Sequence, residues 1–139
     1  MTPRLQRTLT PDLDGLVRLA AESRAFLAGA GVDPGAVFKV QLGLEEVLRN
    51  LAEHAAGAGQ VRVAIQVEPE RVAVTVEDDG KPFDPRTGPP FDPSQPLEER
   101  TGRGMGLHLL RQLMDEIHYE RAGSGNRLRL VIKAPAGTG

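Results

Sequence analysis

Apolar and polar residues alternate along residues 61–67 and again along residues 72–77. Each run places its valines on one face, and the turn at residues 68–71 between them predicts an antiparallel hairpin. A shorter run over residues 4–9 also alternates, but Arg7 interrupts its apolar face. This interruption indicates a strand at the edge of the sheet.

A second hairpin is predicted near the end of the chain. Residues 118–121 and 127–132 have strand character, and the small polar residues 123–126 between them favour a tight turn. Residues 134–139 contain mainly alanine and glycine, so we expect a frayed tail there.

Apolar residues spaced three and four apart predict a helix between the edge strand and the first hairpin. Thr10 is expected as its N-cap, Pro11 as its first helical residue and Asp12 as an acid in its first turn. Gly29 and Gly31 predict its end. We assign this helix to packing.

Two further helices follow from the same spacing. Asp33 and Pro34 repeat the start signal, and the apolar stripe behind them extends from Val37 to Ala55. The third helix is predicted later in the chain, from Leu107 to Ile117.

Prolines recur from residue 82 to residue 96, which excludes a helix or an interior strand in this segment. Residues 97–100 predict a single helical turn after it. A loop of this length in a compact domain is either a functional lid, here about residues 82–103, or a disordered segment.

Antiparallel hairpins with grouped helices predict an α/β (α+β) two-layer sandwich. Its sheet is expected to be mixed but largely antiparallel, with the helices on one face. The length of 139 residues indicates a single domain, residues 1–139. The chain has no strand–G-x-G-x-x-G–helix unit near its N-terminus and no G-x-x-x-x-G-K-[ST], which argues against a Rossmann fold and a P-loop.

Composition narrows the function classes. The net charge of -2 predicts no direct contact with nucleic acid, and the mixed charges predict none with a membrane. Without cysteine there are no disulfides or thiolate metal sites, which suits a reducing cytoplasm. Three widely spaced histidines make a zinc site improbable on spacing alone.

Two bends of small residues flank the long loop. The first contains Asp79 and Gly80 directly after a strand, and the second alternates Gly102, Gly104 and Gly106 before a helix. Glycine amides can approach phosphate oxygens without hindrance from a Cβ, and the helix N-terminus adds positive charge. The pattern predicts a nucleotide site. On the residues alone, an ordinary turn and a disordered loop stay open as alternatives.

The second predicted helix carries the other candidate chemistry. Glu46 and Asn50, four residues apart, lie together beside the apolar stripe, whereas Glu45 and Arg49 fall on the side that faces water. A carboxylate and an amide at the border of the core can meet a metal or a reacting hydroxyl. The alternative is a solvated helix flank. His54 shares this flank and is interpreted as a hydrogen-bonding residue at the helix end.

Three motifs occur in a characteristic order, namely residues 46–50, 78–85 and 102–107. Together they resemble the N, G1 and G2 boxes of the GHKL ATPases, which share the Bergerat ATP-binding fold. Within that superfamily the chain is most similar to the anti-sigma-factor serine kinases of the RsbW and SpoIIAB type. The segments 97–100 and 125–128 add to this resemblance, which extends over nearly the whole chain.

The resemblance implies roles for individual residues. Asn50 is expected to coordinate the Mg²⁺ of bound ATP, and Asp78 to accept a hydrogen bond from the adenine amino group beside Gly80. Glu46 is expected to act as the general base for an attacking serine hydroxyl. The implied nucleotide-binding residues are Asn50, Asp78, Gly80, Gly102, Arg103, Gly104, Met105, Gly106 and Leu107.

The implied function is that of a serine kinase and anti-sigma factor. Such a protein phosphorylates a STAS-domain anti-anti-sigma factor and sequesters a sigma factor, and it is expected to be a cytoplasmic homodimer. The alternative is a partner-switching module that binds ATP but transfers no phosphate. A histidine kinase is disfavoured, because no helix bearing an acceptor histidine precedes the domain.

Overall fold

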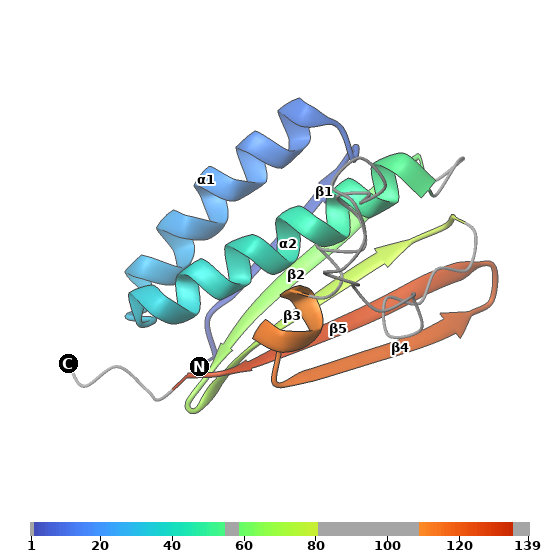
Figure 1. Cartoon of the computed structure of the whole chain (residues 1–139). Coiled ribbons are helices and arrows are strands. Elements are labelled where there is room, and N and C mark those ends of the chain that lie inside the picture. The colour runs from blue at the N-terminus through green and yellow to red at the C-terminus, as the bar shows by residue number, and fades with distance from the viewer. Residues whose placement is uncertain (1, 55–58, 81–108, 135–139) are drawn as a thin grey trace, which may run out of the picture.

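The computed structural model of this chain describes residues 2–54, 59–80 and 109–134. Figure 1 shows two layers, a sheet and the helices that cover one of its faces. The elements follow one another as β1 (Arg4–Leu9), α1 (Leu13–Gly29), α2 (Pro34–His54), β2 (Val61–Glu68), β3 (Arg71–Asp78), β4 (Glu116–Ala122) and β5 (Gly125–Lys133). The predicted two-layer sandwich is confirmed.

The sheet has five strands in the order β1-β2-β3-β5-β4. Every pairing between these described strands is antiparallel, so the parallel part of the expected mixed sheet is not found among them. The predicted alternation is confirmed in the first hairpin, where Val63 pairs with Val76 and Ile65 with Val74. Side chains at alternate positions of a strand share one face of the sheet. These residues are buried because they lie on the face that the helices cover. β1 forms one edge, as the interrupting Arg7 predicted.

The start of α1 corrects one sequence prediction. Asp12, rather than Thr10, is the N-cap, and its carboxylate accepts a hydrogen bond of 2.8 Å from the Gly15 N–H. The backbone N–H of Asp12 bonds to the Thr10 carbonyl at 2.8 Å, so Thr10 and Pro11 form a turn ahead of the helix. An aspartate carboxylate caps the N–H groups of the first helical turn at least as well as a threonine hydroxyl does.

α2 begins at Pro34 as predicted, and Asp33 accepts a hydrogen bond from the Gly35 N–H at 2.9 Å. Its apolar stripe covers the sheet and forms the centre of the core. The buried residues of this stripe are Val40, Leu44, Val47, Leu48 and Leu51. Ala55, the expected end of the stripe, lies outside the described residues.

A short helical segment, described over residues 109–113, packs against α2 at Gly43. A Cβ on Gly43 would lie 3.0 Å from the Met114 Cε and 3.5 Å from the Leu110 Cδ1. The glycine therefore lets this segment approach α2 closely, one helical turn before Glu46.

Ile117 corrects a second prediction, because it belongs to β4 and not to the third helix. It pairs with Leu130 of β5 and packs against the core. The Asp115 N–H already donates to the Val131 carbonyl at 2.9 Å, so the chain joins the sheet just before β4. Pairing with a distant strand overrides the local helical spacing of the apolar residues.

The last hairpin is tighter than predicted. Only Gly123 and Ser124 form its turn, Gly123 has a φ of 60°, and Gly125 and Asn126 already belong to β5. Ala134, expected to begin the frayed tail, is buried, and its N–H donates to the Glu70 carbonyl at 2.9 Å.

The expected lid at residues 82–103 and the helical turn at 97–100 lie outside the described residues. Within the described part of the chain, no helix is long and apolar enough to span a membrane.

Candidate functional site

Glu46 and Asn50 form a buried, hydrogen-bonded pair on α2. Their exposed fractions are 9% and 2%. The Asn50 Nδ2 donates to the Glu46 Oε1 at 2.8 Å and to the Glu46 backbone carbonyl at 2.7 Å. Their burial excludes the interpretation as a solvated helix flank, and the two bonds hold both side chains in one arrangement.

The outward side of α2 contrasts with this pair. Glu45 and Arg49 are exposed, as the helical spacing predicted, and they form an ion pair at 2.6 Å. Arg49 also places its Nη1 3.8 Å from the Glu46 Oε2, so it contributes positive charge beside the buried carboxylate. Such an exposed pair stabilises the helix by only about 0.3–0.5 kcal/mol.

Only the nitrogen of the Asn50 side-chain amide makes hydrogen bonds to the described residues. Its nitrogen makes both of its hydrogen bonds to Glu46. Among the described residues, no group donates to its oxygen, Oδ1. An amide oxygen is a suitable ligand for Mg²⁺, which usually keeps several waters and takes further oxygens from substrate phosphates.

Asp78 ends β3 and is only 3% exposed. It pairs with Val61, a core residue, and therefore faces the layer between sheet and helices. Its Oδ1 accepts hydrogen bonds from the Gly80 N–H at 2.7 Å and from the Asn126 Nδ2 at 3.0 Å. Within the described chain, nothing donates to Oδ2, which leaves an acceptor for a donor group such as the amino group of adenine.

The turn after β3 therefore differs from an ordinary exposed turn, because it holds a buried carboxylate. Gly80 is buried, and its N–H is fixed by the carboxylate two residues before it. Asp79 points outward and is exposed. Local bonds of this kind from an aspartate to the chain stabilise a turn and orient the carboxylate at once.

Three residues that the sequence left unassigned support this turn. Asn126 bonds to Asp78, and Tyr119 and Arg121 of β4 both donate to the Asn126 Oδ1, Arg121 at 3.3 Å. The sequence placed Asn126 in the hairpin turn. Only its inclusion in a segment similar to the serine kinases, residues 125–128, pointed towards it.

Gly125 allows β5 to approach the end of β3. A Cβ at this position would lie 2.6 Å from the Asp78 backbone carbonyl oxygen and 3.2 Å from the Asp79 Oδ1. Because carbon and oxygen atoms do not approach so closely without cost, only glycine fits here without a shift of the backbone.

The two halves of the candidate site lie at the same end of the molecule. Figure 1 shows that the C-terminal end of α2 and the C-terminal end of β3 lie on the same side, with α2 above the sheet. The second glycine motif is not described, so its residues stay predictions. These are Gly102, Arg103, Gly104, Met105, Gly106 and Leu107.

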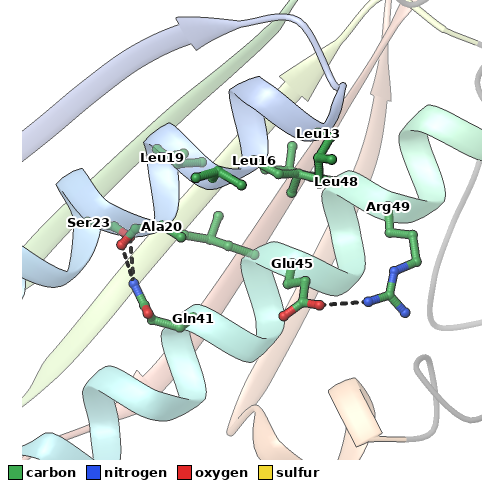
Figure 2. Close-up of a pocket in the computed structure, with 11 residues that line it drawn as sticks. Leu13, Leu16, Leu19, Ala20, Ser23, Gln41, Glu45, Leu48 and Arg49 are labelled. Atoms are coloured by element: carbon green, nitrogen blue, oxygen red, sulfur yellow. Dashed lines mark hydrogen bonds and ion pairs between the residues drawn. The ribbon is translucent and has the colours of Figure 1, made fainter.

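A separate pocket of about 320 Å³ lies between α1 and α2 (Figure 2). Leucines line it, and two polar contacts border it: Gln41 donates to the Ser23 Oγ at 2.9 Å, and Glu45 pairs with Arg49. Of the predicted site residues that the structure describes, namely Glu46, Asn50, Asp78 and Gly80, none lines this pocket. It is therefore distinct from the candidate site.

The donors and acceptors present fit a magnesium-bound adenine nucleotide. The buried Asp78 has an acceptor that suits the amino group of adenine, and the buried Asn50 has an amide oxygen that suits Mg²⁺.

Comparison with known families gives a match over residues 9–132. The matching family is described as the histidine kinase-like ATPase domain. Curated relatives include the serine-protein kinase RsbW of Bacillus velezensis, 30% identical over 117 residues, and that of Bacillus licheniformis, 28% identical over 118 residues. Each alignment covers 79% of this chain and 72% of the relative.

Solved structures show the same fold. The RsbU and RsbW domains of a Mycobacterium tuberculosis protein match with a TM-score of 0.69 and 19% identity, over 95% of this chain and 32% of that one. The mycobacterial sensor histidine kinase MprB matches with a TM-score of 0.50 and 15% identity, over 95% of this chain and 99% of that chain.

Proposed function

Since this chain belongs to the histidine kinase-like ATPase domain family, and within it to the RsbW-type serine-protein kinases, we propose that it is an ATP-dependent serine kinase and anti-sigma factor. Its substrate is a serine of a STAS-domain anti-anti-sigma factor, and its second partner is a sigma factor that it holds inactive. It uses ATP and Mg²⁺ and acts as a cytoplasmic homodimer.

The observation that carries this proposal is the buried, hydrogen-bonded pair of Glu46 and Asn50. A binding module needs no acid beside the cation ligand. A kinase needs a group that accepts a proton from the serine hydroxyl, and it must hold that group close to the phosphates.

Bound Mg²⁺-ATP supplies the phosphoryl group that is transferred. Asn50 would hold the cation through its Oδ1, while its Nδ2 keeps the Glu46 carboxylate in place through the 2.8 Å bond to Oε1. Glu46 accepts the proton of the serine hydroxyl. Asp78 would bind the base at the other end of the site, and the Gly80 N–H fixes the orientation of the Asp78 carboxylate.

Phosphate transfer to a purified STAS-domain protein tests the proposal. The wild-type chain is incubated with Mg²⁺-ATP and the STAS protein, and phosphoserine is measured by mass spectrometry. Glu46→Gln keeps an acceptor for the Asn50 amide but removes the base, so the rate should fall about 10²- to 10⁴-fold. Mg²⁺-ATP affinity should be unchanged.

Glu45→Gln is the matched control, since Glu45 is adjacent, exposed and paired outward with Arg49. It should transfer phosphate at the wild-type rate. Full activity in Glu46→Gln would contradict the role of the base. If the wild-type chain binds ATP and captures partners but forms no phosphoserine, the alternative of a binding module holds. Sedimentation equilibrium tests the homodimer.

A further inference from the structure

A row of polar residues crosses three strands at the end of the sheet. Arg121 of β4 pairs with Asn126 of β5, and Asn126 pairs with Asp78 of β3. Directly opposed residues on neighbouring strands share one face of a sheet. The row therefore lies on the face that the helices cover, and its last member is the carboxylate assigned to the base.

Hydrogen bonds connect this row to the turn after β3. The Arg121 Nη1 donates to the Gly80 carbonyl at 2.6 Å and to the Asn126 Oδ1 at 3.3 Å, and the Nη2 donates to the Ser124 carbonyl at 2.9 Å. The Tyr119 hydroxyl donates to the Asn126 Oδ1. One guanidinium thus ties together both turns that border the candidate base site.

These donors determine the orientation of the Asn126 amide. A guanidinium has only donors, so it favours an oxygen opposite it, and the phenol donates to the same oxygen. The amide nitrogen is then turned towards Asp78, where it donates to Oδ1 at 3.0 Å. If the Asn126 amide were reversed, its oxygen would face the Asp78 carboxylate oxygen, and neither atom could donate a hydrogen bond.

The consequence for Asp78 is that its two oxygens differ. Oδ1 accepts from Asn126 and from the Gly80 N–H, and among the residues described here Oδ2 receives no donor. A carboxylate held in this way presents one oxygen in a fixed direction. A base with an exocyclic amino group supplies a donor to that oxygen, whereas a base with a carbonyl at the same position would oppose it.

We propose that Arg121 and Tyr119 are positioning residues for recognition of the nucleotide base. They act through Asn126 and the Gly80 carbonyl, and they fix the direction of the Asp78 oxygen that discriminates adenine from guanine. This inference rests on the proposed function, because it assumes that Asp78 binds the base.

The test measures dissociation constants of the full-length chain for Mg²⁺-ATP and Mg²⁺-GTP by titration calorimetry. Arg121→Gln should weaken ATP binding about tenfold and narrow the preference for ATP over GTP, since charge-assisted hydrogen bonds are lost. Tyr119→Phe, which keeps the ring, should narrow the preference by a smaller factor. Arg121→Lys, which keeps the positive charge, should retain more of the preference for ATP over GTP than Arg121→Gln does.

Arg127→Gln is the matched control. Arg127 follows Asn126 in β5 and therefore lies on the opposite face of the sheet. Its Nη1 is 3.6 Å from the Glu120 Oε1. It should leave both affinities unchanged. The double variant Arg121→Gln, Asp78→Asn should show no further loss of preference beyond Asp78→Asn alone, because Arg121 acts through Asp78.

The outcomes separate the inference from the proposed function. If Asp78→Asn removes the preference but Arg121→Gln and Tyr119→Phe keep it, the inference is wrong and the base site stands. Equal loss of affinity for both nucleotides, with a lower Tm of the nucleotide-free protein, indicates a structural role only and also overturns it. A wild-type chain that binds neither nucleotide overturns both.

Discussion

Gly125→Ala should damage the candidate site without touching any group that binds a ligand. The new Cβ would lie 2.6 Å from the Asp78 carbonyl oxygen. That oxygen belongs to the backbone of β3, and the neighbouring Asn126 already bonds to the Asp78 side chain. The strain therefore cannot be relieved by rotation of a flexible side chain, and β3 and β5 must move apart.

The size of the effect follows from this contact. Overpacking of a closely packed region costs typically about 1–3 kcal/mol. For a chain of this length, each kcal/mol lowers the Tm by roughly 3–5 °C. We expect a Tm lower by about 3–15 °C in the nucleotide-free protein. A displaced Asp78 should also weaken ATP binding about tenfold, the loss of one charge-assisted hydrogen bond.

Thermal unfolding by circular dichroism and ATP titration measure the two effects. Gly29→Ala is the control, because a Cβ on Gly29 meets nothing within 4 Å. In a helix this change should stabilise the fold by about 0.4–1 kcal/mol. If Gly125→Ala unfolds at the wild-type temperature and binds ATP equally well, the close approach of β5 to β3 is wrong.

Three further predictions concern single side chains. Asn50→Ala should abolish the Mg²⁺-dependent part of ATP affinity and cost only about 1 kcal/mol of stability, and titration with and without Mg²⁺ checks it; undiminished dependence on the cation would refute the assignment. Asp78→Asn should reduce the preference for ATP over GTP, measured as the ratio of the two dissociation constants, and an unchanged ratio would count against base recognition. The hydrogen bond with His118 holds the pKa of the Glu116 carboxyl below its ordinary value of 4.5. A carboxyl whose pKa is lower in the folded than in the unfolded state stabilises the fold when the pH lies above the unfolded pKa. This contribution is lost as the pH falls through the folded pKa. The difference in Tm between the wild type and Glu116→Gln should therefore shrink on acidification from about pH 6 to about pH 3, and a constant difference would contradict the shift.

Much of the fold could be predicted because its signals are local. The alternating valines of β2 and β3 and the apolar stripe of α2 follow from the period of each element. The same geometry placed Glu46 and Asn50 together, since residues four apart on a helix are neighbours.

Element ends were less predictable, because several local solutions have similar energies. Asp12 and Thr10 can both cap α1, and the aspartate is the residue that meets the Gly15 amide. Ile117 fits a helical stripe equally well, but pairing with Leu130 places it in β4.

The sequence by itself determined the periods of the elements and which residue types could bind a nucleotide. Only the tertiary structure decided which side chains support Asp78. Asn126 lies 48 residues away along the chain, and its bond to Asp78 depends on the register between β3 and β5. No local pattern encodes that register, because it results from the burial of both strands under α2 and from the close approach that Gly125 allows.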